Sequence, residues 1–406
     1  LLDAAASGDT AAVQDLLNDE ANANFKTVSK QTPLLVSAKN GHTDVVGILL
    51  DRNADMEATD KSSLTALLHA VKNGHQGIVE LLLERNADTE ATDKSSLTAL
   101  LHAVKKGHQR IVEFLLERNA DTEATDEFSV TALLHAVKNG DQGIVKLLLE
   151  RNADMEATDN FNFTLLHCAI DGGHEGIVKL LLERNASIES KAGSEDAPVP
   201  LPLALRKGHT AIAKILIEHG ADANAKCSGN TPLSLAADMG YAALIPMLLD
   251  KGADFNDKDY FDQTPLHRAA YRGDAAVVDE LSKRLGRVDI ADKYGKTPLH
   301  HAIDSKNMET LASTQGWAEG DATINLKITR GSTALHLAAY KGRMEVVRLL
   351  LANGASPSIR DNSGRTPLYY ARDAIYVEIA ALLEAAEARE VLGGLHEGRW
   401  LIGYGG

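Results

Sequence analysis

The residues of this chain that could do chemistry are its histidines, so their spacing is a first test for a catalytic or metal site. Five of the fifteen histidines directly follow a recurring glycine: His42, His75, His108, His174 and His209. Histidine is a common acid–base group and metal ligand, but no His-Glu-x-x-His zinc pattern occurs, because His174-Glu175 leads to Val178. We therefore expect these histidines to bond a neighbouring loop and to hold no metal.

Two further features could signal chemistry, a phosphate-binding loop and the two cysteines. Gly295-Lys296-Thr297 matches the end of such a loop, but Ile290 stands where the motif requires its first glycine. Two cysteines, Cys168 and Cys227, exclude a disulfide framework and favour a reducing compartment. We expect no catalytic residues, no cofactor and no metal.

The charge and hydropathy of the chain exclude other classes of protein. Its 406 residues include 42 Lys and Arg against 57 Asp and Glu, a net charge of −15, which argues against a general nucleic-acid or anionic-membrane binder. No apolar run is long enough to span a bilayer. The chain starts Leu1-Leu2-Asp3, without Met or a signal-like segment, so we expect a fragment of a longer intracellular protein, cytoplasmic or nuclear.

The elements that position these residues recur with a period of 33 residues. Five threonines lie 33 residues apart, and each stands nine residues before a glycine: Thr32, Thr65, Thr98, Thr131 and Thr164, followed by Gly41, Gly74, Gly107, Gly140 and Gly173. The frame continues to about residue 390, giving a partial first repeat at 1–24 and eleven complete ones. Cys168 and Cys227 then lie two repeats apart, too distant for a bridge or a shared metal at about 8–10 Å per stacked helix.

Each repeat contains two short helical patterns and a polar segment. Thr65 is a helix-capping candidate before Ala66 to Lys72, and after Gly74 a second helix with a broad apolar face ends at Arg85-Asn86. The segment from Asp88 to Leu97 suits an extended finger that returns to the next threonine. Neither helix is long enough to be stable alone, so neighbouring repeats must stabilise it.

These residues resemble the ankyrin repeat very closely. The first-helix signature of that family appears as Thr264-Pro265-Leu266-His267-Arg268-Ala269-Ala270 and as Thr333-Ala334-Leu335-His336-Leu337-Ala338-Ala339. Its loop appears as Gly220-Ala221-Asp222-Ala223-Asn224. The resemblance implies a mainly α, curved solenoid of helix-turn-helix repeats with short β-hairpin fingers.

Some repeats depart from the family pattern. Their histidine stands one place beyond the family position, at His69, His102 and His135. In the same repeats an asparagine replaces the usual loop glycine, at Asn86, Asn119 and Asn152.

The resemblance also implies that a partner binds in a concave groove, lined by finger tips and the exposed side of the first helices. Repeats 61–93 and 94–126 differ at only three positions, and two of the changes add Lys106 and Arg110. Exposed aromatic residues beside charge are typical of binding hot spots. We therefore expect ten residues to contact the partner: Phe128, Phe161, Phe163, Lys105, Lys106, Arg110, Tyr260, Phe261, Tyr271 and Arg272. The alternatives are that the rings only pack on neighbouring fingers and that the cations form a solvated helix end.

Two segments interrupt the array, and a tail follows it. The spacing lengthens near 190–200, in a composition typical of a mobile loop. Near 305–330 a weak second helix precedes Trp317, which either fills the defect or contacts a partner. After an Ala/Glu-rich helix that ends at Leu392, residues 393–406 suit a flexible tail. We expect one continuous array over 1–392.

The preferred function is a non-catalytic, monomeric scaffold that binds another protein in the concave groove. Recently duplicated repeats also resemble the arrays of large fungal proteins, which suggests the sensor arm of a longer protein. The alternative is an enzyme or small-molecule binder with a pocket in the groove, near the loop 190–200 or Trp317. A purely structural spacer would have polar finger tips, which Phe128, Phe161 and Phe163 contradict.

Overall fold

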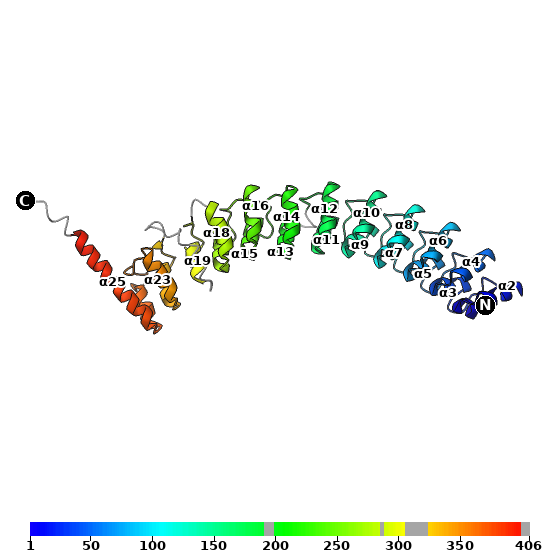
Figure 1. Cartoon of the computed structure of the whole chain (residues 1–406), viewed down its shortest axis with the longest axis horizontal. Coiled ribbons are helices and arrows are strands. Elements are labelled where there is room, and N and C mark those ends of the chain that lie inside the picture. The colour runs from blue at the N-terminus through cyan, green and yellow to red at the C-terminus, as the bar shows by residue number, and fades with distance from the viewer. Residues whose placement is uncertain (191–198, 285–287, 305–323, 399–406) are drawn as a thin grey trace, which may run out of the picture. The chain divides into compact units, whose positions relative to one another are not determined.

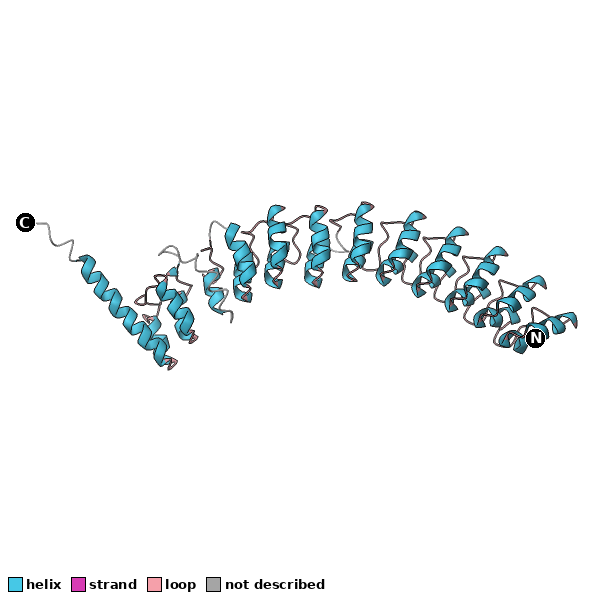
Figure 2. Ribbon diagram, in the orientation of Figure 1, coloured by secondary structure: helices cyan, strands magenta, loops and turns pink. Residues whose placement is uncertain are grey.

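The computed structural model describes residues 1–190, 199–284, 288–304 and 324–398. The chain divides into two compact units, Leu1–Leu203 and Ala204–Gly406, called the N-terminal and C-terminal unit below. Within each unit short helices follow one another in pairs joined by loops (Figures 1 and 2). The predicted mainly α repeat array is confirmed.

In the N-terminal unit, six helix pairs follow the predicted frame. They are α1 (Leu2–Ser7), α2 (Thr10–Asn18), α3 (Pro33–Asn40), α4 (Thr43–Asp51), α5 (Ala66–Asn73), α6 (Gln76–Glu84), α7 (Ala99–Lys106), α8 (Gln109–Glu117), α9 (Ala132–Asn139), α10 (Gln142–Glu150), α11 (Leu165–Asp171) and α12 (Glu175–Glu183). Odd-numbered helices are the first helices of their repeats and even-numbered ones the second.

Helix α13 (Pro200–Lys207) contains the division between the units, and the C-terminal unit continues the frame. Its other helices are α14 (Thr210–Glu218), α15 (Pro232–Met239), the 3-10 helix η1 (Ala242–Leu244), α16 (Ile245–Asp250), α17 (Pro265–Arg272), α18 (Ala275–Arg284), α19 (Pro298–Asp304), α22 (Ala334–Tyr340), α23 (Met344–Ala352), α24 (Pro367–Asp373) and α25 (Val377–Gly398).

Like helices pack on like helices, and this stacking builds the core. In the N-terminal unit α5 contacts α7 and α7 contacts α9, while α6 contacts α8 and α8 contacts α10. The leucines Leu82, Leu115 and Leu148 on successive second helices are fully buried. Each such side chain contributes about 1.5–3 kcal/mol on leaving water, so the short helices owe their stability to their neighbours.

In the N-terminal unit the repeat threonine caps the first helices α3, α5, α7, α9 and α11, as predicted. The Thr65 hydroxyl accepts a hydrogen bond from the Leu68 N–H at 3.2 Å, which satisfies one of the free donors at the helix start. Where histidine occupies the family position, it takes part in the cap, because His267 Nδ1 accepts from the Thr264 N–H at 3.1 Å. Its Nε2 lies 3.1 Å from the Lys296 carbonyl of the next finger.

A repeat glycine in the left-handed conformation follows most of the described first helices, although Ala374 follows α24. Gly74, Gly107 and Gly140 have φ of 76°, 71° and 81°, a region that favours glycine. The asparagines that replace the glycine after the second helix are left-handed as well: Asn86 and Asn119 have φ of 60° and 58°. Asparagine tolerates this region better than most residues.

The histidines that follow the glycine are structural, as expected. His42 Nε2 lies 2.9 Å from the Ala6 carbonyl and His75 Nε2 lies 3.0 Å from the Lys39 carbonyl. Each ring therefore bonds the end of the first helix in the preceding repeat. The ring also covers the glycine of the preceding repeat: a Cβ built on Gly41 would lie 2.8 Å from His75.

The fingers differ from the expected β-hairpins. In the described residues they form tight turns with isolated antiparallel bridges, such as Thr125 with Thr131 and Thr158 with Thr164, and no named strand. The reason is an aspartate at the start of the turn. Asp60 Oδ1 accepts the Ser62 and Leu64 N–H groups at 2.7 and 3.1 Å, so its side chain takes donors that a hairpin ladder would use.

The same aspartate explains the shifted histidines. His69 Nε2 lies 3.0 Å from Asp60 Oδ2, and His102 and His135 reach Asp93 and Asp126 in the same way. A histidine one place beyond the family position thus ties the finger to the first helix of its own repeat.

Parts of the predicted interruptions lie outside the described residues. Residues 191–198 are among these, as are 305–323 with Trp317 and the proposed weak helix. At the end of the array, α25 continues beyond the predicted end at Leu392 to Gly398.

We predict that two glycine substitutions will separate backbone strain from contact. Gly107→Ala should cost about 1–2 kcal/mol of unfolding free energy, because a Cβ there conflicts with positive φ but meets only Asp141 at 3.7 Å. Gly140→Ala should cost more, because its Cβ would lie 2.6 Å from the His174 ring. Urea denaturation of both variants measures the difference. Equal costs would contradict the covering role of the histidine.

We also predict that acid destabilises the array. Burial, followed by the charge of His301, lowers the pKa of both His267 and His300 to about 4. The unfolded chain therefore binds more protons than the folded one between pH about 6.5 and about 4, and stability must fall across this window as the pH is lowered. Denaturation midpoints between pH 7.5 and 4.5 should decline accordingly.

The matched control replaces these histidines with leucine, which other repeats carry there as Leu68 and Leu101. The double variant His267→Leu/His300→Leu should show a shallower decline over the same pH range. An unchanged slope would show that other groups cause the acid sensitivity.

Candidate functional site

The finger aspartates determine which side chains stand at the finger tips. Asp126 Oδ1 accepts the N–H groups of Phe128 and Val130 at 3.0 and 3.1 Å, and its Oδ2 lies 2.9 Å from His135 Nε2. Burial would raise the pKa of the Asp126 carboxyl, but the hydrogen bonds from Val130, His135 and Phe128 hold it below its usual value. We call the second residue after a finger aspartate the tip position.

Aromatic residues occupy the tip position in four fingers. Phe128 and Phe161 are 58% and 75% exposed in the N-terminal unit, and Phe261 and Tyr294 are 49% and 52% exposed in the C-terminal unit. Other tips are serine, among them Ser62 and Ser95. The structure therefore places three of the predicted residues at equivalent positions.

Tyr294 is a tip residue that the sequence reasoning missed. Its N–H donates to Asp292 Oδ1 at 2.8 Å, as the Phe128 N–H does to Asp126. The signal was available, because an aromatic residue follows an aspartate by two positions in both places. The spacing between the aromatic residue and the aspartate, and not the aromatic residue alone, identifies the tip position.

Phe163 is less exposed than Phe128 and Phe161, with which it was grouped. It stands four residues after Asp159, and its N–H donates to that carboxylate at 3.0 Å. This position turns inward, so the ring is half-buried and packs edge-to-face on His167 with centroids 5.6 Å apart. The ring thus packs within the fold, and its contact with a partner stays a prediction.

The other predicted aromatics are exposed. Tyr260 is 79% exposed although its ring lies against the preceding finger, where a Cβ on Gly229 would be 2.4 Å away. On the first helices, Tyr271 and Tyr340 are 62% and 59% exposed. Arg272, beside Tyr271, donates to the Asp238 carbonyl at 2.6 Å.

The predicted cations do not act as one cluster. Lys105 Nζ lies 3.5 Å from Asp126 Oδ2 on the finger, whereas Arg110 on α8 pairs with Glu113 at 2.7 Å and stacks over Phe114 at 4.7 Å. Lys106 is exposed at the end of α7. Lys105 is thus bound to the finger and Arg110 to the second helix.

Buried reactive groups give no sign of catalysis in the described part of the chain. Both cysteines are buried and free, as predicted for core residues. Burial raises the pKa of the Cys168 thiol to about 11, so the thiolate that nucleophilic chemistry needs is scarce at neutral pH. No group of three or more potential metal ligands occurs among the described residues.

One hollow opens on the finger side of the C-terminal unit. The Tyr–Arg hollow, about 590 Å³ in volume, lies between the fingers 328–332 and 361–365 and helix α22. Arg330, Tyr340 and Arg365 line it together with His336, Asp361 and Tyr370. His336 and Asp361 are already bonded, since His336 Nε2 lies 3.1 Å from the Arg365 carbonyl and Asp361 accepts from the Tyr370 hydroxyl at 2.6 Å.

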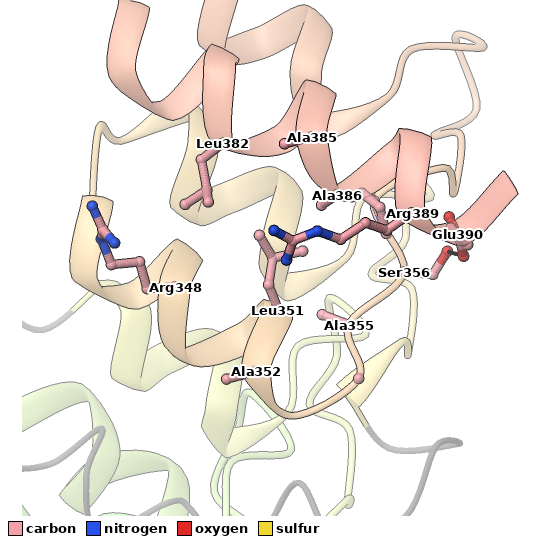
Figure 3. Close-up of a pocket in the computed structure, with 12 residues that line it drawn as sticks. Arg348, Leu351, Ala352, Ala355, Ser356, Leu382, Ala385, Ala386, Arg389 and Glu390 are labelled. Carbon is pink, nitrogen blue, oxygen red and sulfur yellow. Dashed lines mark hydrogen bonds between the residues drawn. The ribbon is translucent and has the colours of Figure 1, made fainter. Parts of the chain in front are cut away.

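Another hollow, about 490 Å³ in volume, lies between the second helices α23 and α25 (Figure 3). Its floor contains Leu351 and Leu382, and Arg348 and Arg389 flank it. It forms because α25 is longer than the other second helices. Small residues of its additional length, such as Ala386, lie opposite the loop after α23. This hollow is lined by second helices and their loop and contains no finger tip.

Comparison with known proteins agrees with this architecture. The family profile for ankyrin repeats in three copies matches residues 1–93, 53–126, 100–192, 193–259 and 310–389. The profile for ankyrin repeats in many copies matches residues 248–302. In the described residues, no helix is long and apolar enough to cross a membrane.

Curated relatives match over short segments. The Caenorhabditis elegans ankyrin repeat and KH domain-containing protein mask-1 is 47% identical over 60 residues, 15% of this chain and 2% of that protein. The C. elegans E3 ubiquitin-protein ligase hecd-1 is 45% identical over 60 residues, 14% of this chain and 2% of that protein. The mouse ARF GTPase-activating protein GIT2 is 43% identical over 54 residues, 13% of this chain and 8% of that protein.

The chain therefore spans only 2% to 8% of the length of these relatives. The family profiles, in contrast, cover nearly all of it, and the capped helices, glycine turns and fingers repeat in the same register. On this evidence the protein belongs to the ankyrin repeat family.

Proposed function

We propose that this chain is a non-catalytic protein-binding array that holds its partner on the finger tips and the exposed side of its first helices. Ankyrin repeats are generally protein-interaction modules, which supports binding as the class of function. The choice of surface rests on the exposed aromatic tips.

The exposed rings of Phe128 and Phe161 are the observation that carries the proposal. They stand at the same position of consecutive fingers, and each backbone is fixed by a carboxylate that is bonded to the first helices: Asp126 to His135, and Asp159 to Lys138 at 3.0 Å. A rigid aromatic side chain on a fixed backbone contacts a partner at little cost in conformational entropy. Exposed rings on successive fingers are what a protein interface uses as anchors.

The enzymatic alternative predicted a groove pocket lined by titratable groups, and the Tyr–Arg hollow has such a lining. Its groups, however, already bond within the fold: Asp361 accepts the Ser363 and Arg365 N–H groups at 2.8 and 2.9 Å, and His336 belongs to the helix cap. These bonds use the atoms that a nucleophile–base pair would need, and so favour binding over catalysis at this hollow. An intracellular location, a monomeric state and a role as a sensor arm stay predictions.

We predict that replacing the two tip rings removes binding without unfolding the array. Phe128→Ser/Phe161→Ser should keep its helical circular dichroism and melting temperature, because both rings are exposed. Partner capture from a lysate of the source cells should weaken at least tenfold, about 1.4 kcal/mol, within the usual range for interface anchors.

The matched control carries Lys146→Ser/Lys179→Ser, two exposed changes on the second helices α10 and α12. It should capture the same proteins as the unmodified chain. If the tip variant and the control capture alike, the partner does not bind the tips of these fingers.

A further inference from the structure

The charge of the chain is unevenly distributed, and one segment has a net positive charge although the rest is negative. Residues 324–373 contain eight Lys and Arg against three Asp and Glu, a net charge of +5, although the whole chain carries −15. This segment supplies the two fingers and the helices around the Tyr–Arg hollow. The hollow is therefore a basic site within an acidic protein.

Two guanidinium groups line the hollow, and the Asp361 carboxylate attracts one of them, that of Arg365. Arg330 and Arg365 are exposed, and neither forms an ion pair in the part of the chain that the structure describes. The one acid in the lining, Asp361, is buried, and its oxygens accept from two backbone N–H groups and from the Tyr370 hydroxyl. Lys341 at the end of α22 pairs with Asp304 at 2.8 Å, whereas Lys327 and Arg360 bond backbone carbonyls. The hollow thus has an excess of positive charge.

The aromatic rings hold one of these cations in place. The Arg365 guanidinium lies 4.9 Å from the ring centre of Tyr369 and 5.9 Å from that of Tyr370. Tyr340 packs edge-to-face on Tyr370 with centroids 6.0 Å apart. The Arg365 guanidinium also hydrogen-bonds the Tyr370 side chain. Its remaining N–H donors can bind a planar anion such as a carboxylate. The exposed ring of Tyr340 adds an apolar wall beside it.

We propose that the Tyr–Arg hollow binds an acidic peptide segment of a partner protein, with carboxylates on Arg330 and Arg365 and an apolar side chain against Tyr340. The proposal rests on the proposed function and gives the chemistry of one part of its surface. A peptide is favoured over a nucleic acid because the rest of the chain carries a net charge of −20. A long polyanion would be repelled outside this one site, whereas a short acidic segment would not.

The test uses the full chain and a fluorescently labelled peptide of glutamate residues around one leucine, with a glutamine analogue as its uncharged control. Fluorescence anisotropy should show saturable binding of the glutamate peptide that weakens as salt is added, and no binding of the glutamine peptide. Arg330→Gln/Arg365→Gln should weaken binding at least about tenfold, because two charge-assisted hydrogen-bonding groups are lost. Its melting temperature should not change, since both side chains are exposed.

The matched control is Arg348→Gln/Arg389→Gln, which removes the same charge from the hollow between α23 and α25. It should bind the glutamate peptide as the unmodified chain does. Equal weakening in both variants, no saturable binding, or tighter binding of a single-stranded oligonucleotide of equal charge would overturn the proposal. These outcomes leave the tip experiment unaffected, because Phe128 and Phe161 belong to other repeats.

Discussion

The hydrogen bonds of the finger aspartate are the interaction on which the proposed binding surface depends. One carboxylate oxygen accepts two backbone N–H groups of the turn, and the other accepts from a first-helix side chain. That side chain stands nine residues later in most fingers, whereas Asp159 accepts from Lys138 of the preceding first helix. That partner varies along the chain: it is His135 for Asp126, Arg268 for Asp259 and Tyr370 for Asp361. The geometry is the same in each case, so the turn is fixed independently of which donor the first helix provides. The residue two positions after the aspartate therefore points outward, whatever its type.

This arrangement separates stability from recognition. The stacked helices bury residues such as Leu82 and Leu115, and the glycine turns with their covering histidines join one repeat to the next. None of these groups is at a finger tip. Tips can consequently change from serine to phenylalanine or tyrosine without disturbing the core, and the exposed rings are available to a partner.

Much of the fold could be predicted from the sequence, because each element has a local physical cause. The threonine caps, the glycines at positive φ and the apolar second helices repeat with a fixed period. The site was predictable only in part. Phe163 and Phe161 are two residues apart in one finger, yet one packs on His167 and the other is exposed. Composition cannot separate them. Both N–H groups donate to Asp159 Oδ1, so the two rings differ only in their place in the turn.

The Tyr–Arg hollow was not predicted for a similar reason. Arg330 and Arg365 lie 35 residues apart and come together only when their fingers stack, and the net charge of the whole chain conceals the local excess of cations. Charge summed over each repeat would have indicated the basic segment. It would not have shown that the one acid in the lining, Asp361, is buried and already accepts the Tyr370 hydroxyl.

The central claim is that a partner protein lies across the finger tips, and site-specific photo-crosslinking tests it most directly. A photoreactive phenylalanine analogue would be placed at residue 128, at residue 161 and, for comparison, at residue 146 on the second helix α10. After irradiation in source-cell lysate, positions 128 and 161 should form adducts with the same protein and position 146 with none. Adducts with that protein from position 146 alone would contradict the account.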